Sequence, residues 1–184
     1  MRVIAGRAKG RMLRAPKSAH VRPTSDLVRG VIFDMLEARG VGWERVLDLY
    51  AGSGALGIEA LSRGAGWADF AEQDARCCAA IRENLDRTGL ADRGRVHCLP
   101  VRQALASLEG RYGLVLLDPP YGDPDLEAVL EELASLELVN GESVVSVEHS
   151  RRAPLPERIG VLRRIVNRRH GDTCVSLYRV EVQI

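Results

Sequence analysis

Hydrophobic positions along the chain fall into short runs typical of buried strands, separated by longer stretches with helical spacing. Strands are predicted at 45–50, 67–72, 95–99, 114–118 and 143–149. Helices are predicted between them at 55–64, 74–88, 101–108 and 125–136. Two later apolar segments lack an intervening helix and are expected to pair antiparallel, at 159–166 and 174–182. Strands that alternate with helices form a parallel sheet with helices on both faces, so we expect an α/β fold.

The N-terminal stretch departs from this alternation. Residues 1–22 mix short apolar pairs with basic residues and glycines, a pattern that predicts a small basic β-hairpin extension. A helix is expected to follow, with Thr24 or Ser25 as its N-cap. We therefore expect an extension over 1–22 and a main domain over 23–184.

The bulk composition narrows the class of protein. The 184 residues are 46% hydrophobic and 28% charged, which is typical of a single globular domain with a continuous core. No apolar run has the length of a membrane span, and the N-terminal stretch lacks the apolar centre of a secretory signal. The four cysteines lack the spacing of a zinc site. We expect a cytoplasmic, monomeric protein with reduced thiols, no metal and no contact with membranes.

The net charge is only +1, but the basic residues gather near the two ends of the chain. Residues 1–30 carry eight Lys and Arg against one acid, and residues 151–170 carry seven Arg against one acid. The block between them has an excess of acids. Two basic ends predict a surface for a polyanion such as RNA. Ordinary solvated charge is an alternative of equal weight.

The segment DLYAGSGALG (48–57) joins the first predicted strand to the next helix, where parallel sheets bind their ligands. Gly52 and Gly54 begin a G-x-G-x-x-G loop, and Glu72 occupies the place of the ribose-binding acid. Asp48 argues against NAD, because a carboxylate at this point repels a pyrophosphate. S-Adenosylmethionine has a sulfonium and an ammonium group and no phosphate, so it suits the acid better. The structural alternatives are a helix-capping role for Asp48 and an exposed strand-end charge for Glu72.

The segment LVLLDPPYGDP (114–124) ends a buried strand with an acid, two prolines and an aromatic ring. A nitrogen conjugated to an aromatic ring is a poor nucleophile, because its lone pair is delocalised. Asp118 and the carbonyl group of Pro119 can accept its two N–H hydrogen bonds, which orients the lone pair and stabilises the charge that grows during methyl transfer. Pro119 and Pro120 stiffen the loop, and Tyr121 can stack on an extruded base. The alternative is an ordinary turn.

The order of these motifs resembles class I methyltransferases that modify exocyclic amines of nucleobases. More narrowly, the chain resembles the bacterial 16S rRNA guanine-N2 methyltransferase family, RsmD. The matching segments are VIAGRAKGRML near the start, 22–33, 48–65, 117–122, 147–150 and 171–179. The resemblance implies a Rossmann-like, seven-stranded sheet whose last strand is antiparallel. It also implies S-adenosylmethionine as methyl donor and guanine 966 of 16S rRNA in the small ribosomal subunit as acceptor.

The same resemblance assigns roles to single residues. It places the base at Asp118, Pro119, Pro120 and Tyr121. It implies donor-binding residues, namely Thr24, Asp48, Tyr50, Ala51, Gly52, Gly54, Glu72 and Gln73. The basic charge of the N-terminal stretch, rather than the resemblance, gives the predicted RNA-binding residues, namely Arg7, Lys9, Arg11 and Arg22.

Some of these assignments leave alternatives open. Arg22 and Thr24 are expected by the methionine carboxylate of the donor, but a phosphate contact and a helix cap are equally good interpretations. The residues that follow the third strand include Pro100 and Val101, where relatives have an acid or amide that contacts adenine. Recognition of adenine is therefore left to the backbone or to Gln103.

Three rival functions share parts of this pattern. A DNA adenine-N6 methyltransferase has the same D-P-P-Y logic, but it usually needs an additional recognition domain for which the chain has no room. A catalytically idle RNA-binding assembly factor is disfavoured by the intact Asp118 and Tyr121. An NAD-dependent oxidoreductase is disfavoured by Asp48.

Overall fold

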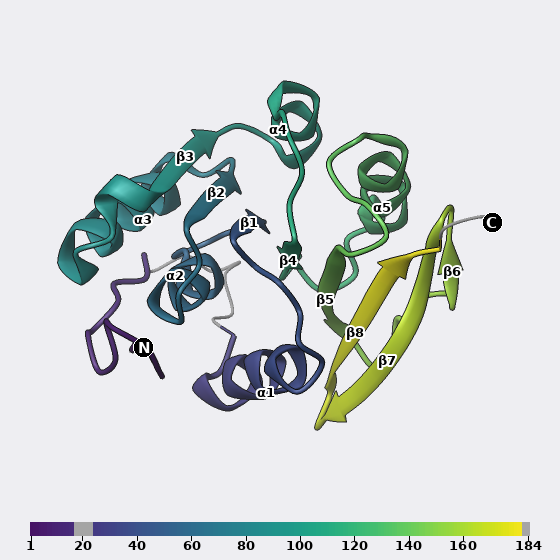
Figure 1. The fold of residues 1–184 in the computed structure, drawn as a ribbon, viewed down its shortest axis with the longest axis horizontal. Helices are drawn as coiled ribbons and strands as arrows, with labels where there is room; N and C mark the ends of the chain where they lie inside the picture. The colour runs from purple at the N-terminus through teal and green to yellow at the C-terminus, as the bar shows by residue number, and fades with distance from the viewer. Residues whose placement is uncertain (17–23, 182–184) are drawn as a thin grey trace.

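The computed structural model describes residues 1–16 and 24–181. Within these ranges, eight strands form one sheet in the order β3-β2-β1-β4-β5-β8-β7-β6 (Figure 1). The parallel part consists of β1 (Arg45–Leu49), β2 (Trp67–Glu72), β3 (Gly94–Cys98), β4 (Leu114–Leu117) and β5 (Val144–Ser150). The antiparallel part consists of β6 (Arg158–Ile159), β7 (Leu162–His170) and β8 (Thr173–Val180).

Helices cover both faces of the sheet (Figure 1). They are α1 (Asp26–Glu37), α2 (Ala55–Ser62), α3 (Ala75–Thr88), α4 (Val101–Ser107) and α5 (Leu126–Ser135), with a 3-10 turn at Ala91–Arg93. The N-terminal segment, α1, α2 and α3 share one apolar core with the sheet, whereas α4 and α5 share a second core with its other face. No helix among the described residues is both long and apolar enough to cross a membrane.

The predicted α/β fold is confirmed, and so is a last strand that runs antiparallel to both of its neighbours. The sheet has one strand more than the seven expected, because the segment predicted at 159–166 is divided. Gly160, with φ of 56°, reverses the chain between the two-residue strand β6 and the long strand β7. A positive φ of this kind is easily adopted by glycine alone.

The N-terminal segment forms the predicted hairpin in a rudimentary form. Arg2 and Met12 make one isolated antiparallel bridge, and the backbone amides of Val3 and Leu13 donate to the carbonyl groups of Arg11 and Met1 at 3.0 and 2.9 Å. The apolar residues Val3, Ala8 and Leu13 are buried in the core beside α1 and α2. The segment therefore packs as part of the domain. Residues 17–22 of the predicted extension lie outside the described residues, so the boundary at 22/23 stays a prediction.

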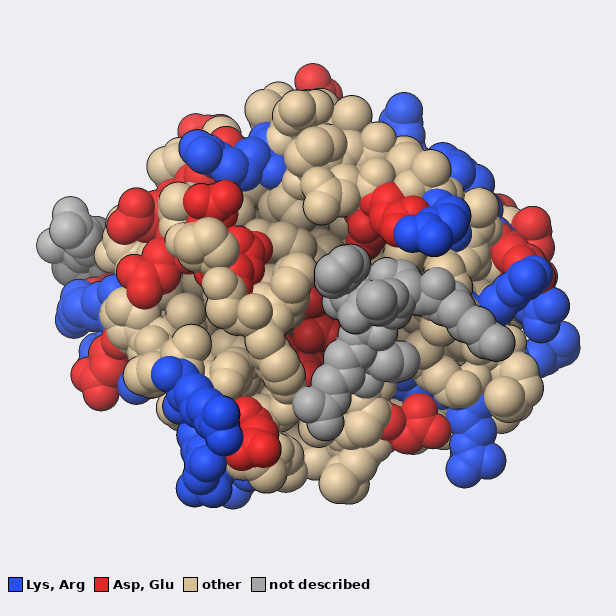
Figure 2. All heavy atoms as spheres, turned by 180° about the vertical axis from the view of Figure 1, so that it is seen from behind, with Lys and Arg blue, Asp and Glu red and all other residues tan. Residues whose placement is uncertain are grey.

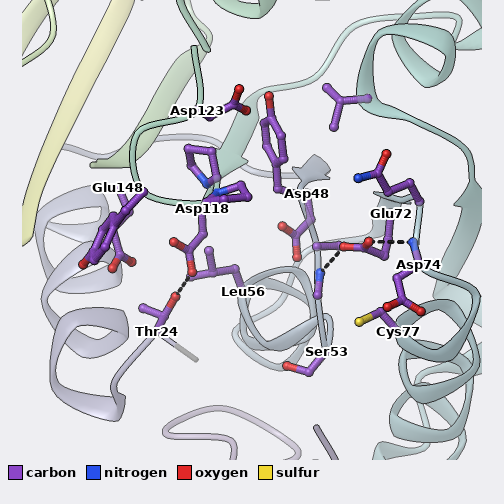
Figure 3. Close-up of a pocket in the computed structure, with 18 of the residues that line it drawn as sticks. Thr24, Asp48, Ser53, Leu56, Glu72, Asp74, Cys77, Asp118, Asp123 and Glu148 are labelled. Carbon is purple, nitrogen blue, oxygen red and sulfur yellow. Dashed lines mark hydrogen bonds between the residues drawn. The ribbon is translucent and has the colours of Figure 1, made fainter. Parts of the chain in front are cut away.

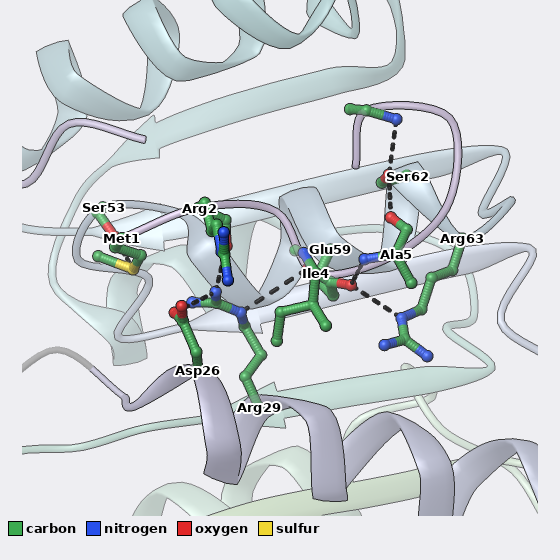
Figure 4. A network of polar contacts seen from close by, with 12 residues as sticks. Met1, Arg2, Ile4, Ala5, Asp26, Arg29, Ser53, Glu59, Ser62 and Arg63 are labelled. Atoms are coloured by element: carbon green, nitrogen blue, oxygen red, sulfur yellow. Dashed lines mark hydrogen bonds and ion pairs between the residues drawn. The ribbon is translucent and has the colours of Figure 1, made fainter. Parts of the chain in front are cut away.

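A buried polar network holds this segment in place (Figure 4). The carboxylate of Glu59 on α2 is fully buried and accepts hydrogen bonds from the backbone amides of Ile4 and Ala5, each at 2.9 Å. It also accepts one from Arg63 Nε at 2.9 Å, and Arg29 Nε lies 3.7 Å away. Because buried backbone amides need partners, the carboxylate of Glu59 holds the chain at Ile4 and Ala5 against α2.

Candidate functional site

A large cavity lies beyond the carboxyl ends of the parallel strands. It has a volume of about 1130 Å³ and is lined mainly by the loops that follow β1, β2, β3 and β4. Figure 2 shows this hollow, with acidic atoms near the middle of the face and Lys and Arg side chains toward its sides. Clefts in this position are where open α/β sheets bind ligands.

Four carboxylates cross the floor of the cavity in a row. Strand register places Leu49 beside Ala71 and Leu117, and Leu117 beside Val147. These four apolar residues all belong to the core under α4 and α5. Since side chains alternate along a strand, the adjacent acids point to the other face. They are Glu72 on β2, Asp48 on β1, Asp118 after β4 and Glu148 on β5 (Figure 3).

Asp48 anchors the start of α2. Its Oδ2 accepts a hydrogen bond from the backbone amide of Gly57 at 2.8 Å, so it satisfies one of the unpaired amides at the N-terminus of the helix. A Cβ atom at Gly57 would lie 2.4 Å from the ring of Phe70, which explains the glycine. Burial raises the pKa of Asp48 well above its usual range, and the negative charges of Asp118 and Glu72 raise it further. The capping interpretation of Asp48 is therefore observed, and its carboxylate also lines the cavity.

Glu72 holds the glycine loop against β2. Its Oε2 accepts from the amide of Gly52 at 2.9 Å, and its Oε1 accepts from the amide of Asp74 at 2.8 Å. A carboxylate has about four acceptor positions. Two remain for hydroxyl groups such as those of a ribose.

The loop itself is sharply bent. Tyr50 has φ of 58°, which is rare for a residue other than glycine, and Gly52 and Gly54 also have positive φ. Burial raises the pKa of Tyr50, and the negative charge of Asp123 raises it further. Gly54 does not line the cavity; it lies against α3, where a Cβ atom would lie 3.1 Å from the side chain of Ile81. The close packing against α3 therefore explains why position 54 is a glycine.

Most of the predicted donor-binding residues share the cavity. Besides the acids, the lining includes Thr24, Tyr50, Ala51, Gly52 and Gln73. The stretch Pro100, Val101, Arg102 and Gln103 also lines the cavity, as does Cys77. The position of Gln103 is compatible with the predicted contact to adenine.

Asp118 and Thr24 are in direct contact, although 94 positions separate them in the sequence. The hydroxyl group of Thr24 donates a short hydrogen bond to Asp118 Oδ2 (Figure 3). Burial raises the pKa of Asp118 to about 6, and the Thr24 hydrogen bond opposes the rise. Ser25 is the N-cap of α1, with its Oγ accepting from the amide of Val28 at 3.2 Å. Thr24 is thus free of the capping role and fixes the orientation of Asp118.

The ring of Tyr121 spans one edge of the cavity. Its hydroxyl group lies 2.6 Å from Thr173 Oγ1 on β8, and 45% of the residue is exposed. Pro119 is buried, and Pro120 is exposed. The exposed ring face can stack on a base.

Several cavity residues are missing from the sequence-based prediction. Glu148 lies near the carboxyl end of a predicted strand as Asp48, Glu72 and Asp118 do, so the same rule could have found it. Thr173 reaches the cavity only because β8 folds back beside β5, and no local motif marks that position.

Met1 was also missed. It lines the cavity, with its Sδ 3.9 Å from the hydroxyl oxygen of Ser53. The N-terminal segment brings it there through the Glu59 network rather than through any local signal.

The predicted RNA-binding side chains of Arg7, Lys9 and Arg11 are exposed on the N-terminal segment. Arg11 Nη1 also donates to the carbonyl group of Arg87 at 3.3 Å. Arg22 lies outside the described residues.

Ion pairs neutralise part of the second basic stretch, 151–170. Asp172 lies 3.3 Å from Arg151, and Glu181 contacts both Arg158 and Arg163. The exposed residues Arg152, Arg168 and Arg169 make no ion pair to a described acid. The free positive charge of this stretch is therefore smaller than the sequence indicates.

Comparison with known proteins places this geometry in a family. The family model described as "Conserved hypothetical protein 95" matches residues 1–179. The chain is 36% identical over 182 residues to the "Putative rRNA methyltransferase YlbH" of Bacillus subtilis, covering 97% of this chain and 98% of that protein. It is 35% identical over 156 residues to the "Ribosomal RNA small subunit methyltransferase D" of Escherichia coli, covering 85% and 78% of the two chains.

Solved structures agree with these relatives. The "Putative methyltransferase yhhF from Escherichia coli" superposes with a TM-score of 0.86 and 32% identity, covering 100% of this chain and 99% of that one. An RNA methyltransferase from Salinibacter ruber in complex with S-adenosyl-L-homocysteine shares the fold, with a TM-score of 0.64, 22% identity and coverage of 89% and 96%. The chain therefore belongs to the family that the matching model describes, the RsmD family of rRNA methyltransferases.

Proposed function

We propose that this protein transfers the methyl group of S-adenosylmethionine to the exocyclic N2 amine of a guanine in 16S rRNA during assembly of the small ribosomal subunit. One observation supports this most strongly. Asp118-Pro119-Pro120-Tyr121 opens into the same cavity as the glycine loop that Glu72 holds. A donor-binding element and an amine-binding element thus face one space.

The residues that line the β1 and β2 side fit S-adenosylmethionine. The two free acceptor positions of Glu72 suit the ribose hydroxyl groups, and the bent backbone at Gly52 lets the ligand approach closely. Asp48 lies one strand away, and a cationic donor there would stabilise its ionised form. The donor supplies an activated methyl group on a sulfonium.

The residues on the β4 side hold the acceptor. Asp118 accepts one N–H of the amine, and the carbonyl group of Pro119 accepts the other. Because Thr24 fixes the carboxylate of Asp118, the acceptor amine is oriented before transfer, and the carboxylate stabilises positive charge on the nitrogen. After transfer, the nitrogen is acidic and loses its extra proton to solvent or to Asp118.

Labelling with a tritiated methyl donor tests this proposal. Small subunits and naked 16S rRNA, both from a strain that lacks the gene, are incubated with the protein, and the labelled nucleoside is mapped. We expect label in N2-methylguanosine at one position with the wild-type protein and none with Asp118→Ala, which should still bind the donor in calorimetry. Label in N6-methyladenosine, or turnover by Asp118→Ala, would overturn it. An idle assembly factor would give no label.

A further inference from the structure

Glu148 lies on the acceptor side of the cavity. The strand order β2-β1-β4-β5 sets the four carboxylates in the sequence Glu72, Asp48, Asp118 and Glu148 (Figure 3). Neighbouring strands are about 4.8 Å apart. Glu148 is therefore next to Asp118 and three strands away from Glu72, on the side opposite to the expected donor.

Tyr121 passes over the end of the strand that carries Glu148. The ring starts from the loop after β4, and its hydroxyl group reaches Thr173 on β8. In the sheet, β5 lies between β4 and β8. The space next to Asp118 is consequently bounded by the ring of Tyr121 on one side and by Glu148 at the floor.

The burial of Glu148 limits what it can recognise. Only 6% of the residue is exposed, and its carboxylate faces the cavity that Asp118 and Tyr121 line. An ionised carboxylate only accepts hydrogen bonds. A base whose edge contacts the ionised forms of both Asp118 and Glu148 must therefore present a hydrogen-bond donor to each.

Among the common bases, guanine presents this pair of donors side by side. Its exocyclic N2 amine and its N1–H are adjacent, whereas adenine has an acceptor at N1 next to its N6 amine. Resting on the function proposed above, we propose that Glu148 accepts the N1–H of the target guanine while Asp118 holds the N2 amine. Glu148 then sets the choice of guanine over bases that have an acceptor at that position.

An analogue of the target base tests this role directly. 2-Aminopurine keeps the exocyclic amine of guanine but has an acceptor at N1. Small subunits are reconstituted with 16S rRNA that carries guanine or 2-aminopurine at the mapped position, and single-turnover rates are measured. The wild-type protein should methylate the guanine substrate about 10- to 100-fold faster, the range expected for a hydrogen bond to a charged group.

The variant Glu148→Gln should reverse part of this preference. Its amide can donate a hydrogen bond to N1 of 2-aminopurine, so the rate on guanine should fall and the ratio between the substrates should shrink at least tenfold. Glu131→Gln is the matched control, because this exposed glutamate on α5 does not line the cavity. Calorimetry with the donor and a urea midpoint show whether the cavity and the fold of Glu148→Gln are intact.

Each outcome has one meaning. An equal loss on both substrates, or an unchanged ratio, overturns the role of Glu148 while the proposed function stands. Failure of the wild-type protein to label guanine N2 on any substrate overturns the proposed function itself. An inverted or narrowed ratio with normal donor binding supports both.

Discussion

The ionised carboxylate of Asp118 weakens the fold that holds it, and the substitution Asp118→Asn measures by how much. Burial raises the pKa of this group from 3.8 to about 6, so its charged form is less favourable in the folded chain than in the unfolded chain. A shift of about two pKa units corresponds to about 3 kcal/mol. At neutral pH the folded wild-type protein carries this destabilisation, and the asparagine variant does not.

The sign of the pH dependence follows from the raised pKa. Protonation of Asp118 stabilises the folded state, an effect that is fully present below pH 3.8 and is lost as the pH rises through about 6. Asparagine does not titrate, and its side-chain oxygen can still accept the hydrogen bond from Thr24. We therefore expect Asp118→Asn to be more stable than the wild type by about 3 kcal/mol at pH 8 and by about half as much near pH 5.

Urea unfolding at both pH values provides the measurement. The comparison is valid only if the m-values of the two proteins agree. Asp34→Asn, at an exposed position of α1, controls for the general effect of removing an aspartate. An Asp118→Asn variant that is no more stable than the wild type at pH 8, or a stability difference that does not narrow at pH 5, would contradict a destabilising charge at Asp118. Methyl transfer by the stabilised variant should be abolished.

Three further changes test other parts of the molecule. Tyr121→Phe should retain most activity, because the ring remains. Tyr121→Ala loses a stacking surface worth about 1–3 kcal/mol, so its kcat/KM on small subunits should fall about 5- to 150-fold. An equal fall in kcat/KM for the two variants would exclude stacking. Glu59→Gln breaks a buried ion pair and should lower the free energy of unfolding, measured in urea, by about 3–5 kcal/mol. The carboxylate of Glu37 is half-exposed, so the control Glu37→Gln should lower it by less than about 1 kcal/mol. Arg7→Gln should reduce the salt dependence of RNA binding by nearly one unit of slope in a filter-binding titration, and Arg39→Gln should leave it unchanged; identical slopes would remove Arg7 from the RNA surface.

The regular elements could be predicted because their hydrophobic patterns are local. The strand predicted at 67–72 coincides with β2, and the helix predicted at 74–88 differs from α3 by one residue. The polar residues at strand ends were equally visible, since an acid after an apolar run stands out. Register then brings them together without further information, because the carboxyl ends of parallel strands meet at one edge.

Contacts between distant segments could not be predicted in this way. Thr24 looks like a helix cap in the sequence, and only the packing of α1 shows that its hydroxyl group reaches Asp118. The apolar residues near the N-terminus fit a hairpin as well as a segment packed on α2. The buried carboxylate of Glu59 fixes the segment on α2, yet in the sequence it is one acid in a helix.

The topology of the sheet explains why the donor and acceptor elements meet. From β1 the chain proceeds to β2 and β3 on one side, and from β4 it proceeds to β5 on the other side. The loops after β1 and β4 therefore diverge and leave a crevice between two adjacent strands. Asp48 and Asp118 stand at the two edges of this crevice. Burial raises the pKa of both acids, and a cationic donor bound between them would stabilise their ionised forms. The row of acids is thus complementary to the charge of the donor and to the positive charge that develops on the acceptor nitrogen.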